Sequence, residues 1–291
     1  MMDLGLMTKI LGLKVDWDRE NGILKISQGL YIDKILERFN MQDAYPVSTP
    51  IAPNIRLNIP DVPKINPYYT KAIGSLMYAA IGTRPDIAFA VQHLSQFTTN
   101  HATEHWTAVK CVLRYLKGTR DQGLIFRRLN TRFNLKIYAD ADFANASDAK
   151  SISGYACLIG DSCVAWSSKK QSVVALSTTE AEYIALTHSA KEMVWLRQLL
   201  EDIGLDMTEP SITFTDNLAT QTITHDASYH TRTKHINIAF HYIRERVVSN
   251  ETKLIHVQSK ENAADVLTKG LDPLKHNYLI SLLGMGKDNT R

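Results

Sequence analysis

The chain has 291 residues, which predicts two domains because most domains contain roughly 100–200 residues. Hydrophobic residues make up 44% and charged residues 22%, a globular composition that excludes a wholly disordered chain. No stretch is long and apolar enough to predict a membrane span, and the N-terminal residues lack the pattern of a signal peptide. Three cysteines without C-x-x-C spacing argue against a disulfide framework and favour a reduced, intracellular protein.

The net charge of +3 is divided unevenly along the chain. Residues 1–129 carry 16 Lys and Arg against 11 Asp and Glu, whereas residues 130–291 carry 17 against 19. This division predicts a basic half that can hold a polyanion and a second half in which carboxylates matter. Chance variation in composition explains a difference of this size equally well.

The first half of the chain predicts a hairpin, a connector and several helices. The Asn21-Gly22 pair between alternating apolar residues predicts a β-hairpin, and Ser27 is expected to cap the helix that follows it. Six of the nine prolines lie within residues 46–67, so this stretch is expected to be an extended connector. Three helices are then expected, around residues 73–80, from Pro85 to about Phe97, and from about Thr103 to Gly118.

The third of these helices carries basic side chains along one face. They lie at helical spacing and continue beyond the helix, as Lys110, Arg114, Lys117, Arg120, Arg127 and Arg128. Such a stripe can follow the phosphates of a nucleic acid. A solvated helix face explains the same pattern equally well.

From Asn134 the pattern changes to strands and helices in alternation. Strands are expected at residues 135–140, 154–159, 163–167, 211–215 and 253–257; a long helix is expected at 178–203, a short and a longer helix after Asp216, and a final helix that carries Asp265. The resulting order, β-β-β-α-β-α-α-β-α, is typical of an α/β layer with a mixed sheet.

Four carboxylates fall at comparable positions in this order. Asp140 and Asp216 each end an expected strand, Glu182 lies in the first turns of the long helix, and Asp265 lies near the start of the last helix. Carboxylates brought together in a buried site repel one another unless a cation joins them, and an all-oxygen site suits Mg²⁺ or Mn²⁺ rather than zinc. A single Asp in such a place is more often a cap or turn residue, but four in this order favour a metal centre.

Ten segments carry a family resemblance, and they occur in the family's order. They are ILGLKVDWDRENGILKISQGLYIDKILERFNM, GSLMYAAIGTRPDIAFAV, HWTAVKCVLRYLKGT, YADADFA, SISGYACLIG, WSSKKQ, ALSTTEAEYIAL, FTDN, HTRTKHINI and ADVLTK. Over nearly its whole length the chain resembles the C-terminal part of copia-type (Pseudoviridae) LTR-retrotransposon Pol polyproteins. The resemblance implies an α/β fold, with a ribonuclease H-like mixed β-sheet and flanking helices at residues 130–291. Residues 1–129 would be a smaller α+β remnant of reverse transcriptase, with the end of the palm, the thumb and a connection.

The resemblance assigns catalytic and metal-binding roles to the four carboxylates. The residues are Asp140, Glu182, Asp216 and Asp265. Asp142 stands beside Asp140, but the strand-end position favours Asp140. Glu180 stands beside Glu182, but the family's E-x-x-A spacing favours Glu182. The implied cofactor is Mg²⁺, as two ions that Mn²⁺ can replace, and two such ions clamp the attacking and leaving oxygens of a phosphodiester.

The implied activity is endonucleolytic cleavage of the RNA strand of an RNA–DNA hybrid, with RNA recognised by its 2′-hydroxyls and by hybrid shape. Candidate nucleic-acid contacts are Lys110, Arg114, Lys117, Lys169, Lys170, Arg232, Lys234 and His235. The family's mobile histidine after the last strand is missing, since His256 lies within that strand. His230 or His235 can substitute for it, although phosphate binding or helix capping explains this tract better.

The polymerase half is expected to be inactive, because the chain contains no Asp-Asp pair and therefore no Tyr-x-Asp-Asp turn. We expect a fragment of a polyprotein or of a degraded element, with the rest of the reverse transcriptase as a candidate partner supplied in trans. It would act inside the cell, in cytoplasmic virus-like particles or the nucleus. The alternative is a catalytically silent nucleic-acid-binding or interaction module. A DNA-cutting transposase or resolvase is disfavoured, because copia-like segments flank the fold on both sides.

Overall fold

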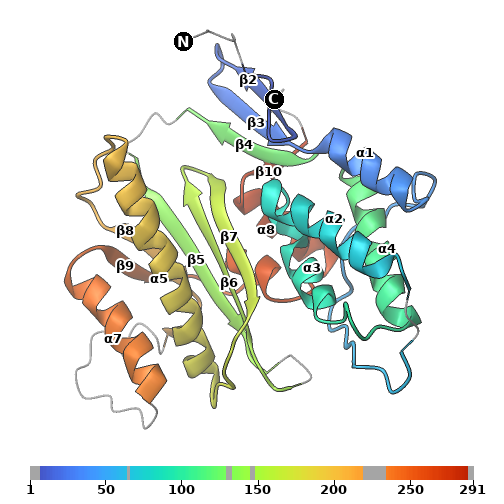
Figure 1. Ribbon diagram of the computed structural model, residues 1–291. Coiled ribbons are helices and arrows are strands. Elements are labelled where there is room, and N and C mark those ends of the chain that lie inside the picture. Colours follow the sequence, from blue (N-terminus) through green and yellow to red (C-terminus); the bar gives the residue numbers. More distant parts are fainter. Residues whose placement is uncertain (1–6, 64–65, 129–132, 145–147, 219–233, 288–291) are drawn as a thin grey trace. The chain divides into compact units, whose positions relative to one another are not determined.

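The computed structural model describes residues 7–63, 66–128, 133–144, 148–218 and 234–287. The chain forms two compact units (Figure 1). Unit 1 consists of Met1–Arg128 together with Gly270–Arg291, and unit 2 consists of Leu129–Lys269. In the described part of the chain, no helix combines the length and the apolar content that crossing a membrane requires.

Unit 1 includes a C-terminal segment that the predicted domain division places in the second domain. Residues 130–291 are predicted to form one domain, but the chain from Gly270 onward packs with unit 1. The reason is a strand pair and a buried contact. Strand β10 (Met285–Gly286) pairs with β4 (Gly123–Arg127), and the helix before β10 brings His276 Nε2 to 3.0 Å from the Tyr115 hydroxyl.

Unit 1 contains an antiparallel sheet whose strand order is β1-β2-β3-β4-β10. Its first strands are β1 (Lys9–Ile10), β2 (Leu13–Asp18) and β3 (Ile23–Ser27). The predicted hairpin is confirmed, since β2 and β3 pair from Asp18↔Ile23 onward and the Asn21 amide donates to Asp18 Oδ1 at 3.0 Å. Gly22 closes this turn with a φ of +66°, a conformation that suits glycine.

Six helical elements complete the described part of unit 1. They are α1 (Gly29–Arg38), α2 (Tyr69–Gly82), the 3₁₀ helix η1 (Pro85–Ile87), α3 (Ala88–Ser95), α4 (Thr103–Gly118) and α8 (Pro273–Leu282). The predicted cap at Ser27 is wrong, because Ser27 ends β3 and Gln28 stands at the start of α1 without a side-chain capping bond. The proline-rich connector contains no helix or strand among its described residues.

Unit 2 is built on a five-stranded sheet with the order β7-β6-β5-β8-β9. The strands are β5 (Leu135–Asp142), β6 (Ile152–Ile159), β7 (Ser162–Lys170), β8 (Ser211–Thr215) and β9 (Thr252–His256). β5, β6 and β7 are antiparallel, whereas β8 is parallel to both β5 and β9. The predicted mixed α/β sheet with flanking helices is therefore confirmed.

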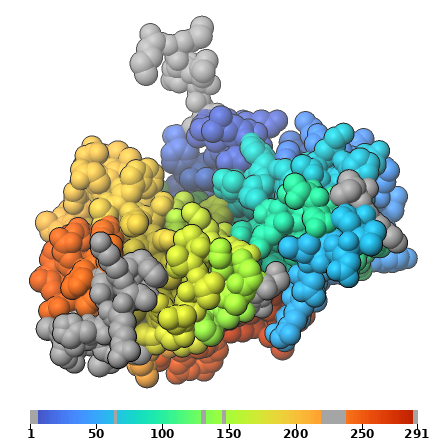
Figure 2. All heavy atoms as spheres, turned by 60° about the horizontal axis from the view of Figure 1, so that its bottom comes forward, coloured from blue at the N-terminus to red at the C-terminus, as the bar shows by residue number. Residues whose placement is uncertain are grey.

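The two faces of this sheet are covered differently. Helix α5 (Thr178–Asp202) packs on β5 and β6, and α7 (Lys234–Val248) packs on α5. Figure 2 shows the gold surface of α5 and the orange surface of α7 next to each other. Apolar residues of α5 and the sheet form one core there, including Ile137, Cys157 and Met193. Gly154 on β6 faces the 3₁₀ helix η2 (Ala263–Leu267). Since side chains alternate along a strand, η2 lies on the face opposite to the one that Cys157 shares with α5.

One predicted helix of unit 2 is shorter than expected, and another falls mostly outside the described residues. The final helix expected to carry Asp265 is the short 3₁₀ helix η2, and the chain then continues into unit 1. The short helix expected after Asp216 falls mostly on residues 219–233, which lie outside the described residues.

Candidate metal centre

Three elements of unit 2 bring carboxylates to one edge of the sheet. Asp140 lies near the end of β5, and Asp216 directly follows β8, the parallel neighbour of β5. Ser177 caps α5 by accepting a hydrogen bond from the Glu180 amide at 3.2 Å, which places Glu182 early in the helix. Carboxylate oxygens of Asp140, Glu182 and Asp216 all lie within 4.8 Å of one another.

Two of these carboxylates are buried, and one of them has an oxygen without a hydrogen-bond partner among the described residues. Asp140 is 2% exposed and Glu182 is 7% exposed. Glu182 Oε2 is buried and has no hydrogen-bond partner among the described residues. Burial, together with the charges of Asp140 and Asp216, raises the pKa of Glu182 well above its ordinary value. A cation would remove this electrostatic cost, and an all-oxygen donor set fits Mg²⁺ or Mn²⁺.

Asp265 reaches the same place from η2 but has a different partner. It is 0% exposed and lies outside the group of three carboxylates. Lys269 Nζ lies 2.9 Å from Asp265 Oδ1 and 3.5 Å from Asp140 Oδ2. Burial alone would lower the pKa of Lys269, but the two carboxylates outweigh burial and raise it. The ammonium group therefore stands charged between Asp140 and Asp265.

Further hydrogen bonds fasten η2 to β5. The Asn262 side chain caps η2 by accepting from the Ala264 amide, and its Nδ2 donates to Ala139 O at 3.0 Å. The Thr268 hydroxyl donates to Asp140 Oδ2. Burial raises the pKa of Asp140, although Lys269 and Thr268 act in the opposite direction. The end of η2 thus contacts the same carboxylate that the group of three contains.

Asp216 is held by the loop after β9. The Ser259 hydroxyl donates to Asp216 Oδ2 at 2.6 Å. This loop is the one in which the sequence lacks the family's histidine. His256 is the last residue of β9, pairs with Thr215 and is exposed. A serine therefore contacts Asp216 from this loop.

The two alternative carboxylates lie outside the group of three. Glu180 accepts a hydrogen bond from the Leu176 amide and so belongs to the start of α5. Asp142 ends β5 and is half-buried. Neither belongs to the group of three, which contains the residues that strand position and motif spacing favour.

The predicted nucleic-acid contacts on α4 belong to unit 1. Lys110, Arg114 and Lys117 are all half-buried there. Arg114 Nε donates to Tyr45 O at 2.7 Å. Arg120, which continues the stripe, donates to both carboxylate oxygens of Asp33. Part of the stripe therefore stabilises unit 1 itself.

The remaining predicted contacts belong to unit 2. Lys169 is exposed at the end of β7, whereas Lys170 Nζ lies 2.9 Å from Asp148 Oδ1. Arg232 lies outside the described residues. Lys234 and His235 begin α7, but their side chains are not among those described. Their role in nucleic-acid binding stays a prediction.

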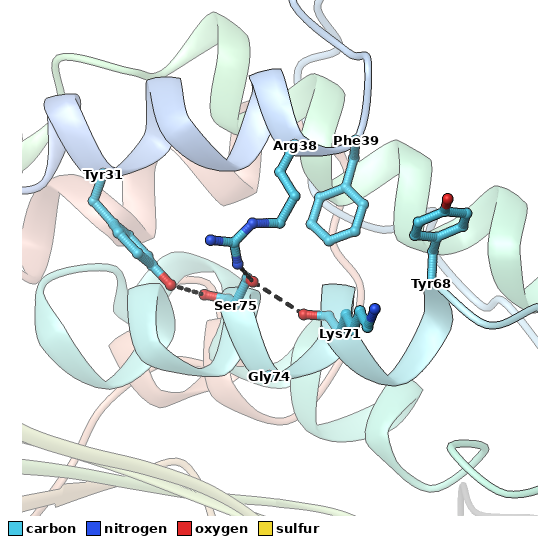
Figure 3. A pocket seen from close by; sticks show the side chains of 7 residues that line it. All are labelled: Tyr31, Arg38, Phe39, Tyr68, Lys71, Gly74 and Ser75. Atoms are coloured by element: carbon cyan, nitrogen blue, oxygen red, sulfur yellow. Dashed lines mark hydrogen bonds between the residues drawn. The ribbon is translucent and has the colours of Figure 1, made fainter.

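Unit 1 has a separate cavity of about 540 Å³ between α1 and α2 (Figure 3). Its lining is aromatic, basic and small: Tyr31, Arg38, Phe39, Tyr68, Lys71, Gly74 and Ser75. Arg38 donates to Ser75 Oγ at 3.3 Å and the Tyr31 hydroxyl donates to Ser75 O at 3.2 Å. The lining contains no carboxylate and so offers no counterpart to the metal centre. The sequence did not single it out, because its residues come from two helices separated by the connector.

The chain is similar to Pol polyproteins of plant transposons. It is 42% identical, over 98% of its length, to the retrovirus-related Pol polyprotein from transposon TNT 1-94 of Nicotiana tabacum. It is 39% identical, over 90% of its length, to that from transposon RE1 of Arabidopsis thaliana. These matches cover 22% and 18% of the two relatives, so the chain spans about a fifth of their length. An uncharacterized mitochondrial protein of Arabidopsis thaliana, AtMg00810, is 32% identical over 67% of this chain and 80% of its own length.

No protein-family model matches the chain. Among solved structures, the foamy viral protease-reverse transcriptase in complex with RNA/DNA hybrid is 14% identical over 87% of this chain and 29% of its own, with a TM-score of 0.45. RNase H1 from Halobacterium salinarum is 18% identical over 46% of this chain and 94% of its own, with a TM-score of 0.34. The fold of unit 2 is therefore assigned from its own sheet topology and not from these similarities. The sequence relatives identify the chain as a member of the copia-type family of retrotransposon Pol polyproteins.

Proposed function

We propose that unit 2 is a ribonuclease H that hydrolyses the RNA strand of RNA–DNA hybrids. The observation that carries this proposal is the cluster of Asp140, Glu182 and Asp216, in which one buried oxygen of Glu182 has no hydrogen-bond partner among the described residues. The order of the carboxylates along the chain is the one that the copia-type resemblance implies. A buried carboxylate cluster with these properties is a place where divalent cations are expected to bind.

The donor set fits Mg²⁺, with Mn²⁺ as a substitute, and we propose two ions in the complex with nucleic acid. Asp140, Glu182 and Asp216 would hold the metal, and Asp265 would be the fourth ligand that the family pattern adds. When bound, the metal would activate a water molecule and stabilise the leaving 3′-oxygen of the RNA strand. The chain's own residues orient the carboxylates: Ser259 holds Asp216, Thr268 holds Asp140 and the start of α5 positions Glu182.

The proposed partner is an RNA–DNA hybrid, recognised by its shape and its 2′-hydroxyls. Lys169 at the end of β7 is an exposed candidate for a phosphate contact in unit 2. Unit 1, with the basic side chains of α4, would be the remnant of reverse transcriptase, and we expect no polymerase activity from this chain alone. Phosphate contacts of this kind make binding strongly salt-dependent.

The test is cleavage of a labelled RNA–DNA hybrid with Mg²⁺ or Mn²⁺. We expect the wild type to cut the RNA strand and to leave duplex DNA intact, and Asp216→Asn to abolish the cutting. Asp161→Asn is the matched control, because Asp161 is exposed on the far end of the β6–β7 hairpin. A folded wild type that binds the hybrid without cutting it would instead indicate a catalytically silent nucleic-acid-binding module.

A further inference from the structure

Lys269 holds a position inside the carboxylate cluster. Its ammonium group lies 2.9 Å from Asp265 Oδ1 and 3.5 Å from Asp140 Oδ2. Asp265 is completely buried, and the side chain of Asp140 is 3% exposed. The two carboxylates therefore form ion pairs with a lysine side chain of the same chain.

The backbone keeps Lys269 in this place. Its amide donates to Asp265 O at 3.2 Å, one residue after the Thr268 amide makes the same kind of bond to Asp265 O at 3.2 Å. This tight turn directs the lysine side chain back over the aspartate that precedes it by four residues. The Thr268 hydroxyl, bonded to Asp140, fastens the turn to β5.

The four carboxylates consequently fall into two groups. Carboxylate oxygens of Asp140, Glu182 and Asp216 lie within 4.8 Å of one another, and Glu182 Oε2 has no hydrogen-bond partner in the part of the chain that the structure describes. Asp265 and Asp140 surround the lysine instead. Asp140 belongs to both groups, so the site of the ammonium adjoins the site expected for a divalent ion. A divalent ion that binds the same oxygens, Asp140 Oδ2 and Asp265 Oδ1, would compete with Lys269 for them.

We propose that Lys269 acts as a resident cation that takes the place of a second divalent ion while no nucleic acid is bound. The free protein then binds one divalent ion, at Asp140, Glu182 and Asp216. A second ion between Asp140 and Asp265 requires that the lysine leaves. This inference rests on the proposed metal centre but concerns how many ions the free protein holds. Lys269 is thus a positioning residue that controls when the centre is complete.

The test is a Mn²⁺ titration of the full chain without nucleic acid, with bound ions counted by electron paramagnetic resonance. We expect one bound ion for the wild type and two for Lys269→Gln over the same range of Mn²⁺ concentration. The affinity for the second ion should be at least about tenfold higher in the variant than in the wild type, because the substitution removes a positive charge beside that site. Lys269→Arg keeps the charge and should resemble the wild type. Lys260→Gln removes an exposed lysine of the same unit and serves as the control.

A purely structural ion pair predicts a different result. Loss of Lys269 would then lower the thermal stability without changing the number of bound ions. Two ions of similar affinity in the free wild type would overturn the proposal, whether or not the variants fold. If Lys269→Gln folds only when Mn²⁺ is present, the metal has replaced the lysine, which supports the proposal.

Cleavage of the hybrid is measured separately, so the two proposals fail independently. A wild type that binds one ion, with a variant that binds two, supports the role of Lys269 even if neither protein cuts RNA. If the wild type holds two ions before nucleic acid is added and then cleaves the hybrid, the proposed ribonuclease H activity is supported and the proposed role of Lys269 is contradicted.

Discussion

Gly154 on β6 lies directly against Thr268, the residue that donates to Asp140. A Cβ atom at Gly154 would lie 2.7 Å from Thr268 Cγ2 and 2.8 Å from Leu267 Cβ. Gly154 is also the cross-strand partner of Asp140 in the β5–β6 ladder. The missing side chain therefore leaves the room in which the end of η2 reaches the carboxylate cluster.

Gly154→Ala should displace η2 from the sheet. Distances below 3.0 Å to a Cβ require a shift, and the two neighbours are the last residue of η2 and the residue that follows it. Overpacking of this kind costs about 1–3 kcal/mol, and the shift should also weaken Mn²⁺ binding. Urea unfolding and Mn²⁺ titration of the same preparation measure both effects.

Gly74→Ala is the control for this substitution. Gly74 lies within α2, and no heavy atom lies within 4 Å of an added Cβ. Alanine in a helix should stabilise unit 1 by roughly 0.5–1 kcal/mol and leave Mn²⁺ binding unchanged. Equal effects of the two substitutions would contradict the close packing between Gly154 and η2.

Glu182→Gln should stabilise the metal-free protein while removing its response to metal. The substitution takes one negative charge out of a buried group that also contains Asp140 and Asp216. The gain without metal should be on the order of 1 kcal/mol, since a shift of one pKa unit corresponds to about 1.4 kcal/mol. The rise in melting temperature that Mg²⁺ gives the wild type should disappear.

Glu201→Gln provides the matched comparison, because Glu201 is exposed near the end of the same helix. It should change neither the stability in EDTA nor the stabilisation by Mg²⁺. If Glu182→Gln is instead less stable than the wild type in EDTA, the Glu182 carboxylate makes a net stabilising interaction in the metal-free protein, which contradicts the prediction.

The elements of unit 2 could be predicted because their signals are local. Alternating apolar residues mark β5, an apolar run marks β6, and a long apolar pattern marks α5. The proximity of Asp140 and Asp216 could be predicted, because Asp140 lies near the end of β5 and Asp216 directly follows β8, its parallel neighbour. The sequence missed β4 and β10, since a strand as short as Met285–Gly286 is defined only by its distant partner.

One wrong prediction and one missed contact have the same physical origin. Ser27 is a good capping residue, yet tertiary pairing placed it in β3 and buried it. The family pattern places Asp265 beside the other carboxylates, but it does not show that Lys269 stands between them. The spacing of four residues between Asp265 and Lys269 is visible in the sequence, whereas the contact with Asp140 depends on how η2 packs on the sheet.

Ser259→Ala should weaken the centre through Asp216. The substitution removes the hydroxyl that donates to Asp216 Oδ2 at 2.6 Å. Hydrogen bonds to charged groups contribute about 1.5–3 kcal/mol, and because Ser259 is exposed we expect the lower end, a loss of about tenfold in hybrid cleavage. Ser249→Ala removes a hydroxyl that donates to Glu251 in the same unit and should leave cleavage unchanged. Equal activity of Ser259→Ala and the wild type would show that Asp216 is held by other contacts.

A buried charge network in unit 1 should make its stability depend on pH. Arg84 Nη2 lies 2.7 Å from Asp86 Oδ2, and the Tyr115 hydroxyl donates to the same oxygen at 2.8 Å. Burial alone would raise the pKa of Asp86, but Arg84 and Tyr115 lower it below the ordinary value. Burial also lowers the pKa of His276, which contacts Tyr115.

Both shifts have the same sign, because each group binds protons more weakly in the folded state than in the unfolded state. The stability that they contribute is complete above the unfolded pKa values, about 6.5 for His276 and about 3.9 for Asp86, and is lost as the pH falls below each value. Hydrogen exchange of α4 amides should therefore show unit 1 losing stability below about pH 6.5 and again below about pH 4. His276→Gln should abolish the first loss only, and His241→Gln, an exposed histidine of unit 2, should change neither. A first loss that persists in His276→Gln would assign it to another histidine.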